Sequence, residues 1–140
     1  ERLAGEQPTL TTFSTLSPIP GFAIWLAENR PNIDTTDDAS MVQSCATYLL
    51  TVRRRSLPQD SVARFHLRNG ACVEQINWRG DTSVKGMAES HGLLVNYLYS
   101  GQDITANNEA LTLDGVVTAS RQVADLLDPL DESLVRVPAN

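Results

Sequence analysis

The sequence predicts a mixed α/β domain, because segments with the two-residue period of strands alternate with segments of helical period. Residues 12–16 (TFSTL) alternate and favour β structure, and residues 93–99 (LLVNYLY) are predicted to form an apolar strand. Between them lies a helical stripe with spacings of four, four and three residues, formed by Met41, Cys45, Leu49 and Val52. With 140 residues, 41% of them hydrophobic, the chain can bury one ordinary core.

Composition and charge disfavour several classes of protein. The net charge of −6 disfavours a nucleic-acid partner and gives no attraction to anionic membranes. The chain has no run of about 18 apolar residues that would predict a membrane span, and residues 1–5 lack the basic start and apolar core of a signal peptide. Cys45 and Cys72 lack metal-ligand spacing, so we expect free core thiols in a reducing compartment, with an interchain disulfide as the alternative.

The first elements come from the start of the chain. Residues 1–11 are polar and predict a loop. In the strand at 12–16 we expect Phe13 to point inward. Ser17 precedes Pro18, and the residue before a proline is pushed into the extended region of backbone space. The strand should therefore end with Ser17 at its tip.

Two helices are predicted next. The first covers residues 22–29 and is ended by residues 31–34, and residues 35–38 supply cap residues for the second. Three consecutive arginines, 53–55, close the second helix, where cations complement the C-terminal dipole. A solvated helix end and a phosphate contact are both open interpretations of this arginine run.

The segment before the alternating stretch 71–78 (ACVEQINW), a predicted strand, allows two interpretations. Asn69 and Gly70 suit a type I′ hairpin turn between two strands. Alternatively, Asp60 or Ser61 caps a helix. That helix would run to about Asn69 and end with Gly70 as its C′ residue.

A third helix and a third strand are predicted after residue 80. The helix covers residues 81–90, is capped by Asp81 or Ser83 and is stopped by Gly92. The strand covers residues 93–99, where apolar and aromatic side chains dominate.

The end of the chain is predicted to hold a loop and a helix. Residues 101–109 are polar and predict the loop. Residues 116–127 predict the helix, whose core-facing residues are Val116, Val123, Leu126 and Leu127.

These patterns identify no catalytic machinery by themselves. His66 and His91 are the two histidines, and a lone histidine is more often structural than catalytic. Neither lies near further metal-ligand candidates in the sequence. The chain has no glycine-rich phosphate loop and no GxSxG nucleophile motif. Composition and spacing therefore lead to a mixed α/β domain and leave its activity open.

Two longer segments resemble one family. Residues 13–26 (FSTLSPIPGFAIWL) and residues 61–99 (SVARFHLRNGACVEQINWRGDTSVKGMAESHGLLVNYLY) are similar, in order and rough spacing, to malonyl-CoA decarboxylases. The resemblance implies a partial GNAT-like acetyltransferase fold, a mixed sheet flanked by helices. It favours the helix ending before Gly70, with His66 late on it. Residues 1–140 would be the C-terminal portion of one catalytic domain, without the helical N-terminal domain and the coenzyme pyrophosphate loop.

The reaction implied by this resemblance converts malonyl-CoA into acetyl-CoA and CO2. The thioester carbonyl accepts the electrons, so no cofactor is expected, and coenzyme A is part of the substrate. Ser17 resembles the family's catalytic serine, which would orient the malonyl carboxylate, and His66 resembles its proton donor. Pro18, Pro20 and Gly21 would hold the Ser17 hydroxyl in place before substrate arrives.

We also expect roles for other residues of the matched segments. Tyr99 resembles a family tyrosine that hydrogen-bonds the catalytic pair, and Tyr97 competes for this place because strand alternation puts both on one face. Besides Ser17 and His66, the candidate substrate-binding residues are Asn77, Ser83 and Asn96. The aromatic residues expected in the core are Trp25, Phe65 and Trp78.

Two functions of other classes stay open. A GNAT-like fold is suited to moving an acyl group from coenzyme A to an amine, and the chain could instead be a non-catalytic assembly or binding domain derived from the enzyme. We expect the isolated 140 residues to bind coenzyme A weakly or not at all and to lack activity. For the full-length protein the family implies a homo-oligomer, a dimer or tetramer, in the bacterial cytoplasm or, in a eukaryote, the mitochondrial matrix.

Overall fold

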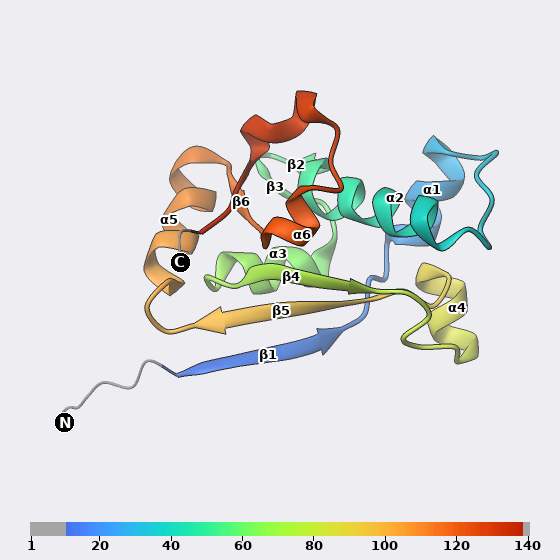
Figure 1. Cartoon of the computed structure of the whole chain (residues 1–140), viewed down its shortest axis with the longest axis horizontal. Helices are drawn as coiled ribbons and strands as arrows, with labels where there is room; N and C mark the ends of the chain where they lie inside the picture. Colours follow the sequence, from blue (N-terminus) through green and yellow to red (C-terminus); the bar gives the residue numbers. More distant parts are fainter. Residues whose placement is uncertain (1–10, 139–140) are drawn as a thin grey trace.

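Three strands form the central sheet, in the order β1-β5-β4 (Figure 1). The computed structural model describes residues 11–138, so residues 1–10 of the loop predicted for residues 1–11 lie outside the described part. The strands are β1 (Thr12–Ser17), β4 (Cys72–Asn77) and β5 (Leu94–Ser100), and β5 pairs antiparallel with both neighbours. β1 ends at Ser17 as predicted, and Ser17 lies opposite Val95 of β5.

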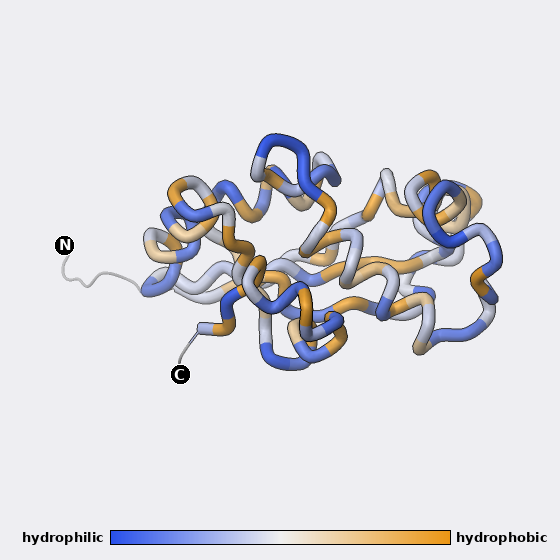
Figure 2. Tube along the Cα trace, turned by 90° about the horizontal axis from the view of Figure 1, so that it is seen from above, coloured by the Kyte–Doolittle hydropathy of each residue, from blue (hydrophilic) through white to orange (hydrophobic). Residues whose placement is uncertain are grey.

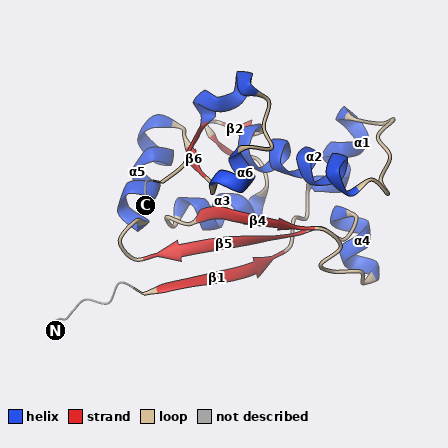
Figure 3. Ribbon diagram, viewed as in Figure 1, coloured by secondary structure: helices blue, strands red, loops and turns tan. Residues whose placement is uncertain are grey.

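Helices, short strands and the loops that connect them make up the rest of the described chain (Figure 3). The helices are α1 (Phe22–Asn29), α2 (Asp38–Thr51), α3 (Ser61–Arg68), α4 (Val84–Ser90), α5 (Ile104–Asp114), α6 (Arg121–Ala124) and a 3₁₀ turn (Pro129–Leu134). The short strands are β2 (Arg53–Arg54), β3 (Leu57–Pro58), β6 (Val117–Thr118) and β7 (Val135–Arg136). The central sheet is antiparallel. β6 pairs parallel with β7 in a separate two-stranded sheet, and an isolated parallel bridge links Val73 of β4 to Ala119, so strand pairing in the described chain is mixed. The predicted mixed α/β fold is confirmed.

The core lies between one face of the sheet and the helices. Met41, Cys45 and Leu49 of the predicted stripe are fully buried, whereas its fourth member, Val52, follows the end of α2 and is partly buried. Burying a Met or Leu side chain contributes about 1.5–3 kcal/mol. Val95 and Tyr97 of β5 are also fully buried and face this side of the sheet. Figure 2 shows hydrophilic segments in the peripheral loops and hydrophobic segments along the strands and inner helices. Among the described residues, no helix is long and apolar enough to span a membrane.

The segment with two interpretations is a helix, as the resemblance favoured. The Asp60 carboxylate caps α3 by accepting from the Ala63 N–H, and Gly70 follows the helix with φ +90°. Only glycine suits Gly70 well, because a Cβ there would also meet the backbone of Ile104 at the start of α5. His66 therefore lies on the second turn of an eight-residue helix, Ser61–Arg68.

Two predictions near the C-terminus were wrong. Residues 101–109, predicted as a loop, mostly belong to α5, which is anchored by the buried Asn107 donating to the Gly70 carbonyl at 2.9 Å. Asparagine has low helix propensity, and a tertiary hydrogen bond overrides it here. Residues 116–127, predicted as one helix, form β6 and the short α6, because Val117 and Thr118 pair with β7. Of the predicted core-facing residues, Val123 and Leu127 are buried.

Two aromatic residues are more exposed than predicted. Phe13 lies on the inner face of the sheet as predicted, because it sits opposite Tyr99 and stacks on that ring at 4.8 Å, but it is 53% exposed because β1 is an outer strand. Phe65, predicted in the core, is 62% exposed, because it lies on the solvent side of α3. Trp25 and Trp78 are partly buried against the core as expected. Cys45 and Cys72 are buried free thiols, also as expected.

The arginine run does not prolong α2. The helix ends at Thr51, and Arg53 and Arg54 form β2. Arg53 nevertheless contacts the helix end, because its Nε and Nη2 donate to the Leu50 carbonyl at 3.1 and 2.8 Å. Its Nη2 also donates to the Leu134 carbonyl at 3.0 Å, so Arg53 fastens the C-terminal segment to α2.

Candidate active site

Ser17 and His66, 49 positions apart in sequence, meet at the end of the sheet. Ser17 is the last residue of β1, and His66 lies on α3, which crosses the inner face of the sheet. The Ser17 Oγ and His66 Nε2 atoms are 3.3 Å apart and share a hydrogen bond. Ser17 is 5% exposed and His66 is half-buried. The structure thus brings together the two residues singled out as a catalytic pair.

Two tyrosines of β5 contact the His66 imidazole, and the structure shows that each makes a different contact. The Tyr99 hydroxyl hydrogen-bonds His66 Nδ1 at 2.5 Å. Tyr97 instead stacks on the imidazole, with ring centroids 4.5 Å apart and planes inclined by 22°. Burial raises the pKa of both tyrosines, so both phenols stay neutral at ordinary pH. Tyr99 fixes one ring nitrogen and Tyr97 fixes the ring plane.

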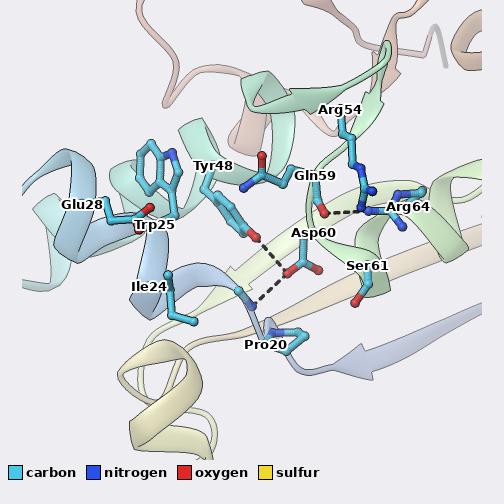
Figure 4. Close-up of a pocket in the computed structure, with 11 residues that line it drawn as sticks. Pro20, Ile24, Trp25, Glu28, Tyr48, Arg54, Gln59, Asp60, Ser61 and Arg64 are labelled. Atoms are coloured by element: carbon cyan, nitrogen blue, oxygen red, sulfur yellow. Dashed lines mark hydrogen bonds between the residues drawn. The ribbon is translucent and has the colours of Figure 1, made fainter.

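The turn after Ser17 is tied to the start of α3 by Asp60, which sequence reasoning treated only as a helix cap. Asp60 Oδ1 accepts from the Gly21 N–H and the Tyr48 hydroxyl, each at 3.3 Å, and Oδ2 accepts from the Ala63 N–H at 3.0 Å. Figure 4 shows this carboxylate among the residues that line a cavity of about 440 Å³, and neither Ser17 nor His66 is one of those lining residues. Burial raises the pKa of Asp60, and the backbone N–H donors partly offset that effect. Asp60 therefore joins the serine-bearing turn and the histidine-bearing helix.

We expect Gly21→Ala to loosen this junction. A Cβ at position 21 would overlap the Tyr48 hydroxyl, so either the turn or the Tyr48 ring, both hydrogen-bonded to Asp60, must shift. Overpacking of this kind costs about 1–3 kcal/mol, and denaturant unfolding of the full-length protein measures the loss. In a Tyr48→Phe background the same change should cost less, because the clashing hydroxyl is gone. An equal loss in both backgrounds would contradict this explanation.

The three other candidate residues do not reach the Ser17–His66 pair. Asn96 alternates with the inward Val95 and Tyr97, so it lies on the second face of the sheet, where Asn77 Nδ2 donates to Asn96 Oδ1 at 2.8 Å. Ser83 caps α4 by accepting from the Gly86 N–H at 3.1 Å. Asn96 does approach the site from behind, because its Nδ2 donates to the carbonyl of Thr15 at 3.0 Å.

The resting imidazole is expected to be neutral. Burial lowers the pKa of His66 below its usual 6.5. A carboxylate bound beside it would raise that pKa again, because an opposite charge favours the imidazolium. We therefore expect an NMR titration of the full-length protein to give a value below 6.5 without ligand and a higher value with a bound carboxylate ligand. A value that ligand leaves unchanged would place the carboxylate elsewhere.

These contacts define a class of site: a hydroxyl, an imidazole and a phenol hydrogen-bonded in a row on a mixed α/β domain, an arrangement suited to proton transfer. Comparison with known proteins identifies the family. The family described as malonyl-CoA decarboxylase C-terminal domain matches residues 31–137. The chain belongs to the malonyl-CoA decarboxylase family.

Relatives and solved structures agree with this assignment. The mitochondrial malonyl-CoA decarboxylase of Anser anser anser is 29% identical over 95% of this chain, and that of Mus musculus is 30% identical over 91%. Crystal structures of malonyl-CoA decarboxylases from Agrobacterium vitis and Rhodopseudomonas palustris superpose with TM-scores of 0.76 and 0.75 over 83% of the chain, at 38% and 39% identity. The chain spans 35% of each of the two mitochondrial relatives and 35% and 33% of these two structures, about a third of each. The fold is consistent with a partial GNAT-like domain.

Proposed function

We propose that the full-length protein decarboxylates malonyl-CoA to acetyl-CoA and CO2, with Ser17 orienting the malonyl carboxylate and His66 protonating the product enolate. The observation that carries the proposal is the 3.3 Å contact between Ser17 Oγ and His66 Nε2 in a chain of this family. A carboxylate bound by the serine hydroxyl would place the neighbouring α-carbon within reach of the imidazole.

The reaction needs no electron acceptor other than the substrate itself. The bond between the carboxylate carbon and the α-carbon breaks, and its electron pair moves into the thioester carbonyl to give an enolate. Neutral CO2 leaves. The imidazolium of His66 then gives its Nε2 proton to the α-carbon, which forms acetyl-CoA and leaves neutral imidazole. The imidazole recovers its proton from solvent with the next substrate.

A neutral hydroxyl suits the carboxylate better than a cation would. The carboxylate loses its charge as CO2 forms, so a strong ionic contact would stabilise the ground state more than the transition state. A hydroxyl can hold the carboxylate with its breaking bond perpendicular to the carbonyl plane without this cost. Pro18, Pro20 and the Gly21–Asp60 hydrogen bond restrict the turn that carries the hydroxyl.

Tyr99 determines which imidazole nitrogen transfers the proton. Its hydroxyl lies 2.5 Å from Nδ1, and in the proposed mechanism Nδ1–H donates to the phenol oxygen in both the imidazolium and the neutral imidazole. Nε2 is then the nitrogen that gains and loses the proton, and it is the nitrogen that faces Ser17. Tyr97 packs under the ring and limits its rotation.

The test is an assay of the full-length protein with malonyl-CoA and no amine acceptor. The proposal predicts equal amounts of acetyl-CoA and CO2. Product that forms only when an amine is supplied would instead identify an acyltransferase, and no product under either condition would favour a non-catalytic binding domain. A homo-oligomeric state and a cytoplasmic or matrix location remain predictions from the family.

A further inference from the structure

We propose that Thr15 is a positioning residue whose hydroxyl donates to Ser17 Oγ and so directs the Ser17 proton toward the substrate carboxylate. The inference rests on the proposed decarboxylation and adds to it the residue that sets the direction of the serine hydrogen bond. Thr15 and Ser17 lie two positions apart on β1, and their side chains share the face that holds His66.

The geometry places the two hydroxyls in contact. Thr15 Oγ1 lies 2.9 Å from Ser17 Oγ, closer than the 3.3 Å between Ser17 Oγ and His66 Nε2. Thr15 is half-buried and sits opposite Tyr97, whose ring stacks on His66. Within residues 11–138, Ser17 is the hydrogen-bond partner of the Thr15 hydroxyl. The threonine is therefore part of the same hydrogen-bonded row.

The direction of these bonds follows from the donor count of a serine hydroxyl, which has one proton to donate and two lone pairs that accept. While the malonyl carboxylate is bound, before the Nε2 proton moves to the α-carbon, the imidazolium Nε2–H donates to one lone pair of Ser17 Oγ. If Thr15 donates to the other, the Ser17 proton has no partner inside the protein and points to the bound carboxylate. If Thr15 accepted instead, it would compete with the substrate for that proton.

The backbone of Thr15 is fixed from the second face of the sheet. Asn96 Nδ2 donates to the Thr15 carbonyl at 3.0 Å, Asn77 donates to Asn96 at 2.8 Å, and Gln75 donates to Asn77 at 3.0 Å. This row of amide side chains links all three strands of the sheet and ends at the backbone of Thr15, whose side chain neighbours that of Ser17. It limits movement of β1 at the position where the two hydroxyls must stay aligned.

The test compares Thr15→Val with Thr15→Ser in the full-length protein. Valine keeps the shape and β-branching of threonine and lacks the hydroxyl, whereas serine keeps the hydroxyl. We expect Thr15→Val to lower kcat/KM about 3- to 10-fold, the effect of one hydrogen bond, and Thr15→Ser to stay within about twofold of wild type. Thr12→Val, at an exposed position on the other face of the same strand, is the matched control and should be silent.

A second measurement uses affinity. Wild type should bind an unreactive malonyl-CoA analogue with a sulfonate in place of the carboxylate more tightly than it binds acetyl-CoA, and Thr15→Val should reduce that preference by the same factor, about 3- to 10-fold. Loss in both Thr15 variants would assign the effect to packing and overturn the inference. Unchanged or increased activity in Thr15→Val would overturn it as well, while wild-type decarboxylation leaves the proposed function standing. A wild-type protein that neither decarboxylates nor prefers the sulfonate would overturn both.

Discussion

Replacing His66 by asparagine is expected to lower kcat for acetyl-CoA formation by about 10²- to 10⁴-fold, the range over which a positioned general acid contributes. Asparagine keeps a polar group of similar reach, but it cannot give a proton to carbon at neutral pH. The enolate would have to take its proton from water. Substrate binding should change much less, because Ser17 still contacts the carboxylate, so KM should stay within a few-fold of wild type.

The chain offers a matched control in its other histidine. His91 ends α4 in the left-handed conformation, with φ 53°, which asparagine also adopts readily. His91→Asn should therefore leave kcat within about twofold of wild type. Near-normal turnover in a folded His66→Asn variant, or equal losses in the two variants, would remove His66 from the chemistry.

Ser17→Ala is expected to lower kcat/KM by about 10²-fold, the cost of losing precise placement of a reacting group. Unlike the histidine variant, this one should show a raised KM as well as a lower kcat, because the hydroxyl contacts the carboxylate in the bound substrate. Ser14→Ala, an exposed position on the opposite face of β1, should have no effect. Steady-state kinetics of wild type, Ser17→Ala and Ser14→Ala, measured in parallel, gives the changes in kcat and KM.

A second reaction separates the serine from the histidine. Acetyl-CoA has no carboxylate, so exchange of its methyl hydrogens with D2O needs the imidazole and does not need the carboxylate-orienting hydroxyl. The Ser17→Ala variant should retain this exchange, whereas the His66→Asn variant should lose it. If Ser17→Ala abolished exchange while the protein stayed folded, the serine would act on the α-carbon rather than on the carboxylate.

The sequence predicted the main elements where local signals were strong. The stripe of Met41, Cys45 and Leu49 defined α2, and Ser17 before Pro18 defined the end of β1. α5 was missed because its asparagines have low helix propensity and weaken the helical signal in the sequence. In the folded chain, the hydrogen bond from Asn107 to the Gly70 carbonyl stabilises the helix. The exposure of Phe65 was missed because, in a helix as short as α3, the apolar residues alone do not settle which face packs on the sheet.

In the candidate site, too, some features could be predicted from the sequence and others depend on tertiary contacts. The resemblance to a known family singled out Ser17, His66 and Tyr99, and the structure places them in one hydrogen-bonded row. The contacts of Asp60 and the proposed positioning role of Thr15 were not visible in the sequence, because each depends on contacts that sequence spacing does not encode. Asp60 accepts a hydrogen bond from the Gly21 N–H, 39 positions away in sequence. The face to which the Thr15 side chain points is set by the pairing of β1 with β5.

A crystal structure of the full-length protein with the sulfonate analogue of malonyl-CoA tests the central claim most directly. We predict a sulfonate oxygen at about 2.6–3.2 Å from Ser17 Oγ, the range of an ordinary hydrogen bond, with the α-carbon facing His66 Nε2 and the imidazole still held by Tyr99. An acyl group bound elsewhere, with the Ser17–His66 hydrogen bond unchanged and no ligand beside it, would contradict the proposed catalytic site.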